Sequence, residues 1–260
     1  MPVARQRPAV QVVGYHSRVE DHAALLLADE GAVTVERLDP GTELTYALGQ
    51  RHCAGAVDGE RHYACDGADA PYCPEHTSRW PCARCTGDCN KPIEACDEEH
   101  VVYLAVFAPD TVKVGVTRSW RLETRLREQG ADRAAHLRTV ADGRIARQIE
   151  ADVATDLGDR VRVPTKIAGL HESVDEQFWS TLLDEYETLA TYDFDYGLAL
   201  TERPMAETLA TGTVRGTKGR VAVLDNNGST YAVDLRALVG YEVTDGGTDR
   251  DLQSSLGAFG

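Results

Sequence analysis

All seven cysteines of this sequence fall between Cys53 and Cys96, and none occurs elsewhere in its 260 residues. Cysteines that serve only as small buried side chains would be scattered along the chain. An odd number cannot pair completely into disulfides within one chain, and a reducing cytoplasm disfavours a disulfide framework. The block therefore predicts metal ligation.

Two tetrahedral metal sites can be assembled from this block. Tetrahedral zinc takes four Cys or His ligands, and short loops such as Cys73-x-x-His76 and Cys82-x-x-Cys85 bring two ligands to one ion without strain. The seven cysteines and His76 make eight ligands, which predicts two structural zinc ions. The expected ligand groups are Cys53, Cys65, Cys73 and His76, and Cys82, Cys85, Cys89 and Cys96. The spacing is equally compatible with an interleaved pairing of these ligands.

Residues 51–100 contain few large apolar side chains from which to build a core. Nearly all of them are Val57, Tyr63, Tyr72, Trp80 and Ile93. Structural zinc can supply on the order of 10 kcal/mol of folding free energy to such a segment. An iron–sulfur cluster and a redox-active or unligated block are the alternatives, and the four-cysteine group is the harder one to assign between zinc and iron. Three other histidines are weaker ligand candidates: His52, His62 and His100.

The charge of the chain is unevenly distributed. The net charge is −15, and 23 of the 27 basic residues are arginine, a balance typical of a salt-adapted protein whose carboxylate surface retains water. Residues 113–147, however, carry nine basic and four acidic side chains, a net +5 that leaves −20 for the rest. This basic segment indicates a DNA or RNA partner, with a solvated helical face as the alternative.

Membrane insertion and secretion are not expected. The longest apolar run, VVYLAVFA, is far shorter than the roughly 20 residues that cross a bilayer, and MPVARQRPAV lacks the apolar core of a signal peptide. We therefore expect a cytoplasmic protein with no membrane partner.

Apolar periodicity predicts an α+β protein. Strand patterns occupy both ends of the chain, with Asn227-Gly228 as a hairpin turn, and the two ends are expected to pair into one small β-domain. Two apolar strands in residues 101–116 precede amphipathic helices near 117–129, 143–157 and 172–190. The expected segments are a β segment (1–50), a Cys-rich zinc-binding module (51–100), an α/β domain (101–200), a second β segment (201–244) and a disordered tail (245–260).

The two strands of residues 101–116 carry short motifs ten residues apart. Tyr103 ends VVY, and KVG begins at Lys113, followed by a basic helix with the sequence RLREQGA. Over roughly residues 101–158 this pattern resembles the GIY-YIG superfamily, which implies a small sheet with flanking helices. The first motif lacks its glycine, Lys113 replaces the tyrosine of the second, and the asparagine of many such nucleases has no counterpart here. The closest overall resemblance is to an uncharacterised, cysteine-containing group from salt-loving archaea that shares KVGVTR and a GTKGR-like segment.

The resemblance implies candidate catalytic residues for phosphodiester hydrolysis. Tyr103 and Gly115 match motif positions, Arg125 matches the helix arginine with Arg121 as its competitor, and Glu150 matches the carboxylate that holds a single divalent metal. Mg²⁺ on Glu150 would polarise the phosphate, Arg125 would offset its developing charge, and Tyr103 or Lys113 would orient or deprotonate water.

The residues themselves allow simpler readings as well. Arg118, Arg121 and Arg125 are spaced to share one helical face suited to phosphate oxygens. Glu150 lies beside a predicted buried stripe of four residues, where it needs a metal or a plain ion pair with an arginine. Tyr103 could equally be a buried core residue. The stripe consists of Ile145, Ile149, Val153 and Leu157.

These patterns together predict a zinc-stapled, nucleic-acid-associated protein with a GIY-YIG-like domain. The implied activity is divalent-metal-dependent phosphodiester hydrolysis. The first alternative is a module that binds nucleic acid or protein without catalysis, favoured by Lys113 in the second motif. The second alternative is a thiol redox or metal-sensing protein, which would need exposed cysteines of low pKa.

Overall fold

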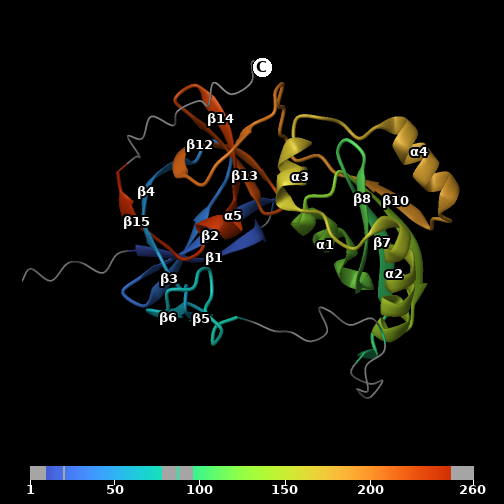
Figure 1. Cartoon of the computed structure of the whole chain (residues 1–260), viewed down its shortest axis with the longest axis horizontal. Helices are drawn as coiled ribbons and strands as arrows, with labels where there is room; N and C mark the ends of the chain where they lie inside the picture. The colour runs from blue at the N-terminus through green and yellow to red at the C-terminus, as the bar shows by residue number, and fades with distance from the viewer. Residues whose placement is uncertain (1–9, 20, 78–86, 88–95, 247–260) are drawn as a thin grey trace, which may run out of the picture.

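The computed structural model describes residues 10–19, 21–77, 87 and 96–246, which form a mixed α+β structure of two sheets and a few helices (Figure 1). The predicted metal ligands Cys82, Cys85 and Cys89 lie outside the described residues, as does nearly all of the predicted tail. Among the described residues, no helix combines the length and the apolar character that crossing a membrane requires.

Eleven strands form the larger sheet, in the order β11-β14-β13-β12-β4-β15-β1-β2-β3-β6-β5. β4 is hydrogen-bonded to β12 on one side and to β15 on the other, so segments from both ends of the chain share this sheet. From the N-terminal half come β1 (Val10–Val19), β2 (His22–Asp29), β3 (Ala32–Arg37), β4 (Glu43–Arg51), β5 (Ala56–Asp58) and β6 (Arg61–Tyr63). From the C-terminal half come β11 (Met205–Ala206), β12 (Ala210–Lys218), β13 (Val221–Asn226), β14 (Ser229–Asp234), the short helix α5 (Leu235–Leu238) and β15 (Tyr241–Asp245).

The two halves of the larger sheet bury one common core. Leu25 and Leu44 from the N-terminal strands pack in the same cluster as Leu224 from β13. The predicted hairpin turn is confirmed, because Asn227 and Gly228 join β13 to β14 with φ values of 49° and 75°. Positive φ at both central residues is what a tight hairpin turn requires, and Asn-Gly supplies it at little strain.

The smaller sheet has four strands, in the order β10-β9-β7-β8. Its strands are β7 (His100–Phe107), β8 (Thr111–Arg118), β9 (Arg133–Val140) and β10 (Ala190–Asp193). The accompanying helices are the 3₁₀ turn η3 (Ser119–Arg121), α1 (Leu122–Gln129), α2 (Gly143–Leu157), α3 (Val163–Ala168) and α4 (Glu176–Glu185).

β7 is buried on both faces, as its unbroken apolar sequence predicts. On one face Tyr103 packs with Leu126 of α1, and on the other Leu104 packs with Ala146 of α2 and Leu182 of α4. The helices thus cover both sides of the sheet, and β8 is left as an edge strand beside α1 and α2.

The helices only partly follow the predicted patterns. α2 has the predicted bounds, and the Asp142 side chain caps its first turn by accepting from two backbone N–H groups. The buried stripe was wrong at Ile145, which is 43% exposed because Ala146 takes the core position. The third helix was predicted too long: it ends at Glu185, and Leu189 beyond it is 62% exposed. α3 was not predicted.

The two sheets meet where residues 216–220, GTKGR, turn from β12 into β13 against the end of α1. The Lys218 Nζ lies 2.6 and 2.7 Å from the two carboxylate oxygens of Asp132, and this ion pair is largely buried. A Cβ on Gly219 would lie 2.7 Å from the backbone nitrogen of Gly130. The two segments can therefore approach this closely only with glycine at position 219. The segment therefore joins the sheet that carries the α1 and α2 helices to the larger sheet.

Candidate functional site

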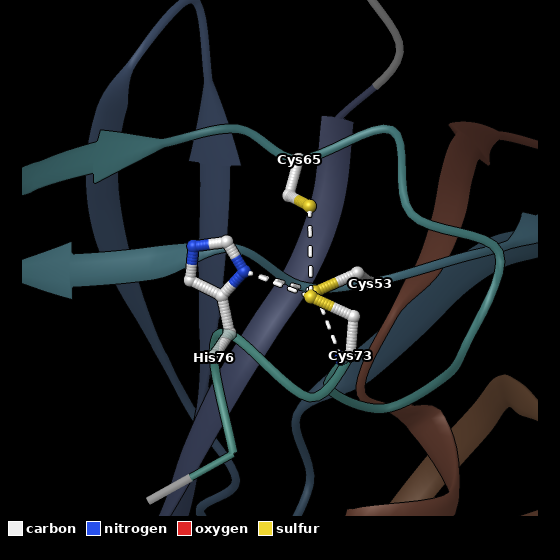
Figure 2. A group of neighbouring side chains, drawn as sticks. All are labelled: Cys53, Cys65, Cys73 and His76. Atoms are coloured by element: carbon white, nitrogen blue, oxygen red, sulfur yellow. Dashed lines mark hydrogen bonds between the residues drawn. The ribbon is translucent and has the colours of Figure 1, made fainter.

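Four of the predicted metal ligands converge at one edge of the larger sheet (Figure 2). Cys53 follows β4, Cys65 follows β6, and Cys73 and His76 lie in the loop that continues from them. One ligand atom from each residue lies within 4.8 Å of the others, which describes a Cys₃His group that could bind one metal ion.

The distances within the cluster fit tetrahedral zinc. Zinc–sulfur and zinc–nitrogen bond lengths place two sulfurs about 3.8 Å apart and a sulfur and a nitrogen about 3.6 Å apart around one ion. The Cys65 and Cys73 sulfurs are 3.9 Å apart. The His76 Nδ1 lies 3.5 Å from the Cys53 sulfur and 3.2 Å from the Cys73 sulfur. The donor set and the spacing therefore suit a closed four-coordinate site.

Backbone N–H groups support the sulfurs of this cluster. The Cys53 sulfur accepts from the N–H of Cys73 at 3.2 Å and from that of Gly55 at 3.4 Å, and the Cys65 sulfur accepts from Gly67 at 3.4 Å. Burial raises the pKa of the Cys53 thiol, but the hydrogen bonds from Cys73 and Gly55 outweigh it, so the pKa is lowered. Donors aimed at a sulfur favour the thiolate, which is the form that binds metal.

The other predicted ligands are not in this cluster. Cys96 lies four residues before the start of β7 and is half-buried, while its three expected partners fall outside the described residues. The second metal site therefore stays a prediction. The three weaker histidines each contact a backbone carbonyl: His52 that of Cys65, His62 that of Ala54 and His100 that of Glu98.

A second site is a cavity of about 560 Å³ at the edge of the smaller sheet. It is formed by β7, β8, the start of α1, the middle of α2 and the loop after α2. It brings together every residue that the sequence singled out for catalysis or phosphate binding. The residues of that set that line the cavity are Tyr103, Lys113, Gly115, Arg118, Arg121, Arg125 and Glu150.

Gly115 makes room for the Tyr103 ring. The two residues face each other in the β7–β8 ladder, and a Cβ on Gly115 would lie 2.6 Å from the tyrosine Cζ and from its hydroxyl oxygen. The Tyr103 oxygen accepts a hydrogen bond from the Gln129 Nε2 at 2.6 Å. The ring is 2% exposed and belongs to the core, and burial raises the pKa of the Tyr103 hydroxyl. Tyr103 is thus a core residue whose hydroxyl also borders the cavity.

Lys113 lies on the same face as Tyr103, two residues before Gly115. Its Nζ donates to the backbone oxygen of Asp159 at 3.3 Å. Burial, followed by the positive charge of Arg125, lowers the pKa of Lys113 to about 8. At mildly alkaline pH a large share of this side chain is therefore neutral and able to accept a proton.

Every predicted arginine in the cavity also contacts a carboxylate. Arg118 pairs with Glu98 at 2.6 Å, while Arg121 and Arg125 share Glu128 at 2.9 and 3.2 Å. The side chains of these three arginines remain 40 to 49% exposed. Such partly exposed pairs are weak and leave the guanidinium groups able to take a phosphate instead.

Glu150 forms an ion pair with Arg147, one turn earlier on α2, at 2.5 Å, and its side chain is 14% exposed. Glu150 therefore has an arginine partner in the structure. The i,i+3 spacing on one helix could have indicated this partner from sequence. No sequence pattern could have indicated Gln129 and Asp159. Each is distant in the sequence from the residue that it contacts, Tyr103 and Lys113 respectively.

Neither the curated proteins nor the solved structures gave a match to this chain. A protein family described as being of unknown function, DUF2797, matches residues 65–243, which is more than half of the chain and includes the whole cavity. The chain therefore belongs to the DUF2797 family.

Proposed function

We propose that this protein binds nucleic acid in the cavity between β8, α1 and α2, and that the cavity hydrolyses a phosphodiester. The observation that carries the proposal is the charge of the lining. Six basic side chains and two carboxylates line the cavity, and two more carboxylates, Glu98 and Glu128, pair with its arginines, so positive charge remains in excess in a chain whose net charge is −15. A basic cavity within an acidic protein attracts and positions phosphate groups. The six are Lys113, Arg118, Arg121, Arg125, Arg147 and Arg160.

The order of elements around the cavity supports a GIY-YIG-like domain. A hairpin, β7–β8, is followed by α1 with Arg125, by β9 and by α2 with Glu150, which is the order that the resemblance implies. The close packing of Tyr103 on Gly115 gives a physical reason for a tyrosine and a glycine at these two positions. The order of the elements and the positions of the motif residues together support the proposal of a GIY-YIG-like domain.

The protonation states of the residues in the cavity suggest a different role for each of them. Tyr103 stays protonated at neutral pH and, with Gln129 donating to its oxygen, has its own O–H proton free to orient water or phosphate. Lys113 in its neutral form accepts the proton of the attacking water. Arg125 offsets the charge that grows on the phosphate oxygens.

Glu150 is suited to holding a divalent ion. Its Oε2 accepts from Arg147, and a carboxylate has a second oxygen to offer. A Mg²⁺ ion held there would supply polarisation of the scissile phosphate.

The Cys₃His cluster is assigned to structural zinc. A redox or sensing role would need exposed thiols, whereas Cys53 and Cys73 are buried. Cys53, Cys65, Cys73 and His76 would hold the ion, and its bonds would stabilise the loops after β4 and β6, where apolar side chains are sparse.

A second candidate is a module that binds nucleic acid without cutting it. The Glu150–Arg147 ion pair favours this candidate, because the carboxylate already has a cationic partner. Lys113 in place of the motif tyrosine points the same way.

The deciding experiment measures binding and cleavage of labelled DNA and RNA over a Mg²⁺ series. We expect Glu150→Gln to lose cleavage while keeping its fold, and Arg125→Ala to slow cleavage on the order of 100-fold. Glu185→Gln and Arg203→Ala, at exposed positions outside the cavity, serve as matched controls. Cleavage by Glu150→Gln equal to that of the parent would reject hydrolysis in this cavity and leave the binding module, and a parent that binds no nucleic acid would reject both.

A further inference from the structure

Trp120 is an unusually exposed aromatic residue. It lies in the η3 turn between β8 and α1, and 72% of it is exposed, more than any other large hydrophobic residue of the described part of the chain. Burial of a large indole would stabilise the fold, so the turn gains nothing from displaying it. A single exposed aromatic side chain is common on protein surfaces, so a role for Trp120 depends on what lies beside it.

Two arginines within two residues of Trp120 in the sequence supply the cavity with cations. Arg118 and Arg121 line the cavity, and the guanidinium carbon of Arg121 lies 5.8 Å from the centre of the Trp120 ring. Arg121 is also held by Glu128 at 2.9 Å. The indole therefore lies beside one guanidinium group that lines the cavity, that of Arg121, and Glu128 holds this group by an ion pair.

A flat aromatic face beside phosphate-binding guanidiniums matches one unit of a nucleic acid. A base can stack on the indole while its phosphate is bound by Arg118 or Arg121. A free phosphate or a phosphorylated side chain would use the arginines and leave the indole bare. In a duplex the faces of the bases are stacked on each other, so a base is available only in a single-stranded or unpaired segment.

We propose that Trp120 is a stacking platform and that the cavity takes single-stranded DNA or RNA, with one unpaired base on the indole and the adjoining phosphate among the arginines. This inference rests on the proposed function and names its substrate class. It assigns to η3 the task of presenting the base, and to the cavity that of holding the backbone.

The test compares the parent with Trp120→Ala and Trp120→Phe, using labelled strands of roughly ten nucleotides, within the site sizes of single-strand binders. The probes are single-stranded DNA, single-stranded RNA, the DNA duplex, and a DNA strand without bases at its central positions. Leu189→Ala is the control, since Leu189 is 62% exposed and lies outside the cavity. Both Trp120 variants change an exposed side chain, so the fold should be retained.

Loss of one stacking contact should weaken binding of the intact single strand by about 5- to 150-fold in Trp120→Ala. Trp120→Phe should recover most of the affinity, and duplex binding should change little. The strand without central bases should bind the parent as weakly as the intact strand binds Trp120→Ala, with no further loss when both changes are combined. Quenching of tryptophan fluorescence by the intact strand should be largely lost in Trp120→Ala.

Two results would overturn the inference while leaving the proposed function in place. One is tight binding of the intact strand by Trp120→Ala, equal to the parent. The other is a parent that prefers the duplex to the single strand. A parent that binds none of the four probes would instead reject the proposed function, and the inference with it.

Discussion

The Cys₃His cluster and the cavity on the smaller sheet are built in opposite ways. Around the cluster, the loops of residues 52–76 bury little besides Cys53, Ala54 and Cys73, so their positions depend on the ligands themselves. The cavity, by contrast, borders β7, a strand whose residues from Val101 to Phe107 are all buried. One site is expected to be held by metal bonds and the other by packing, so each should fail under a different perturbation.

Removal of the metal should produce the largest effect, and only on the cluster. Loss of a structural ion removes on the order of 10 kcal/mol of local folding free energy, so Cys73→Ser should open residues 52–76 to protease while β7 and β8 stay protected. Limited proteolysis and hydrogen exchange check this outcome. Elemental analysis should find close to two zinc ions in the parent and close to one in either Cys73→Ser or Cys96→Ser. Equal loss of protection in β7 would contradict the separation of the two sites.

Gly115→Ala should produce a smaller effect, and only on the cavity. Its new Cβ would meet the Tyr103 ring at 2.6 Å, and a buried ring in a packed core has little room to move. We expect a loss of about 1–3 kcal/mol in the free energy of unfolding, with the zinc content unchanged. Gly49→Ala is the matched control, because this strand glycine has its nearest neighbour at 3.4 Å. A denaturation midpoint for Gly115→Ala no lower than that of Gly49→Ala would refute the steric argument.

The smallest expected effect is a pH dependence of stability that arises at Lys166, which is not among the residues that line the cavity. The Lys166 Nζ donates to the backbone oxygen of Gln129 and lies 4.1 Å from the centre of the Phe107 ring. Burial, and then the nearby charge of Lys113, lower the pKa of Lys166 from 10.5 to about 7. Between these two values the unfolded chain holds a proton that the folded chain has released, so stability should rise with pH across this window.

The gain should approach about 1 kcal/mol per pH unit in the middle of the window. Thermal unfolding of the zinc-loaded protein between pH 7 and 9 measures it. Lys166→Met keeps the length of the side chain and removes the titration, so its stability should rise less steeply. Parallel pH profiles for parent and variant would show that Lys166 does not carry the effect.

Short sequence patterns predicted the features that depend on interactions between residues close together in the chain. The bounds of α2 follow from the Asp142 cap and an apolar repeat, and the β13–β14 turn follows from Asn227-Gly228. The short Cys73-x-x-His76 spacing joins two ligands of the cluster, whereas the spacings to Cys53 and Cys65 allowed an interleaved pairing as well. The sequence also predicted that the residues lining the cavity belong to one site, because the resemblance to GIY-YIG motifs gave their order along the chain.

Short sequence patterns could not predict contacts between segments that are distant in the sequence. The hydrogen bond from Gln129 to Tyr103 depends on how α1 docks on β7, and the pairing of Lys218 with Asp132 depends on how the two sheets meet. Ile145 was misplaced because periodicity does not say which of two neighbouring apolar residues faces the core. α3 has six residues, too few for a helical repeat to be recognised.

The position of β4 between β12 and β15 has a consequence for synthesis on the ribosome. β4 emerges early, at residues 43–51, but its neighbours on both sides are made only with residues 210–245. Until then the nascent chain carries a strand with two open edges, which is the state that most readily joins to another chain. The smaller sheet, whose strands all lie within residues 100–193, can form during that interval. A truncated product that ends after residue 193 would therefore have a folded smaller sheet and N-terminal strands with unpaired edges that can join to other chains. Chaperones and proteases would be expected to act on such a product.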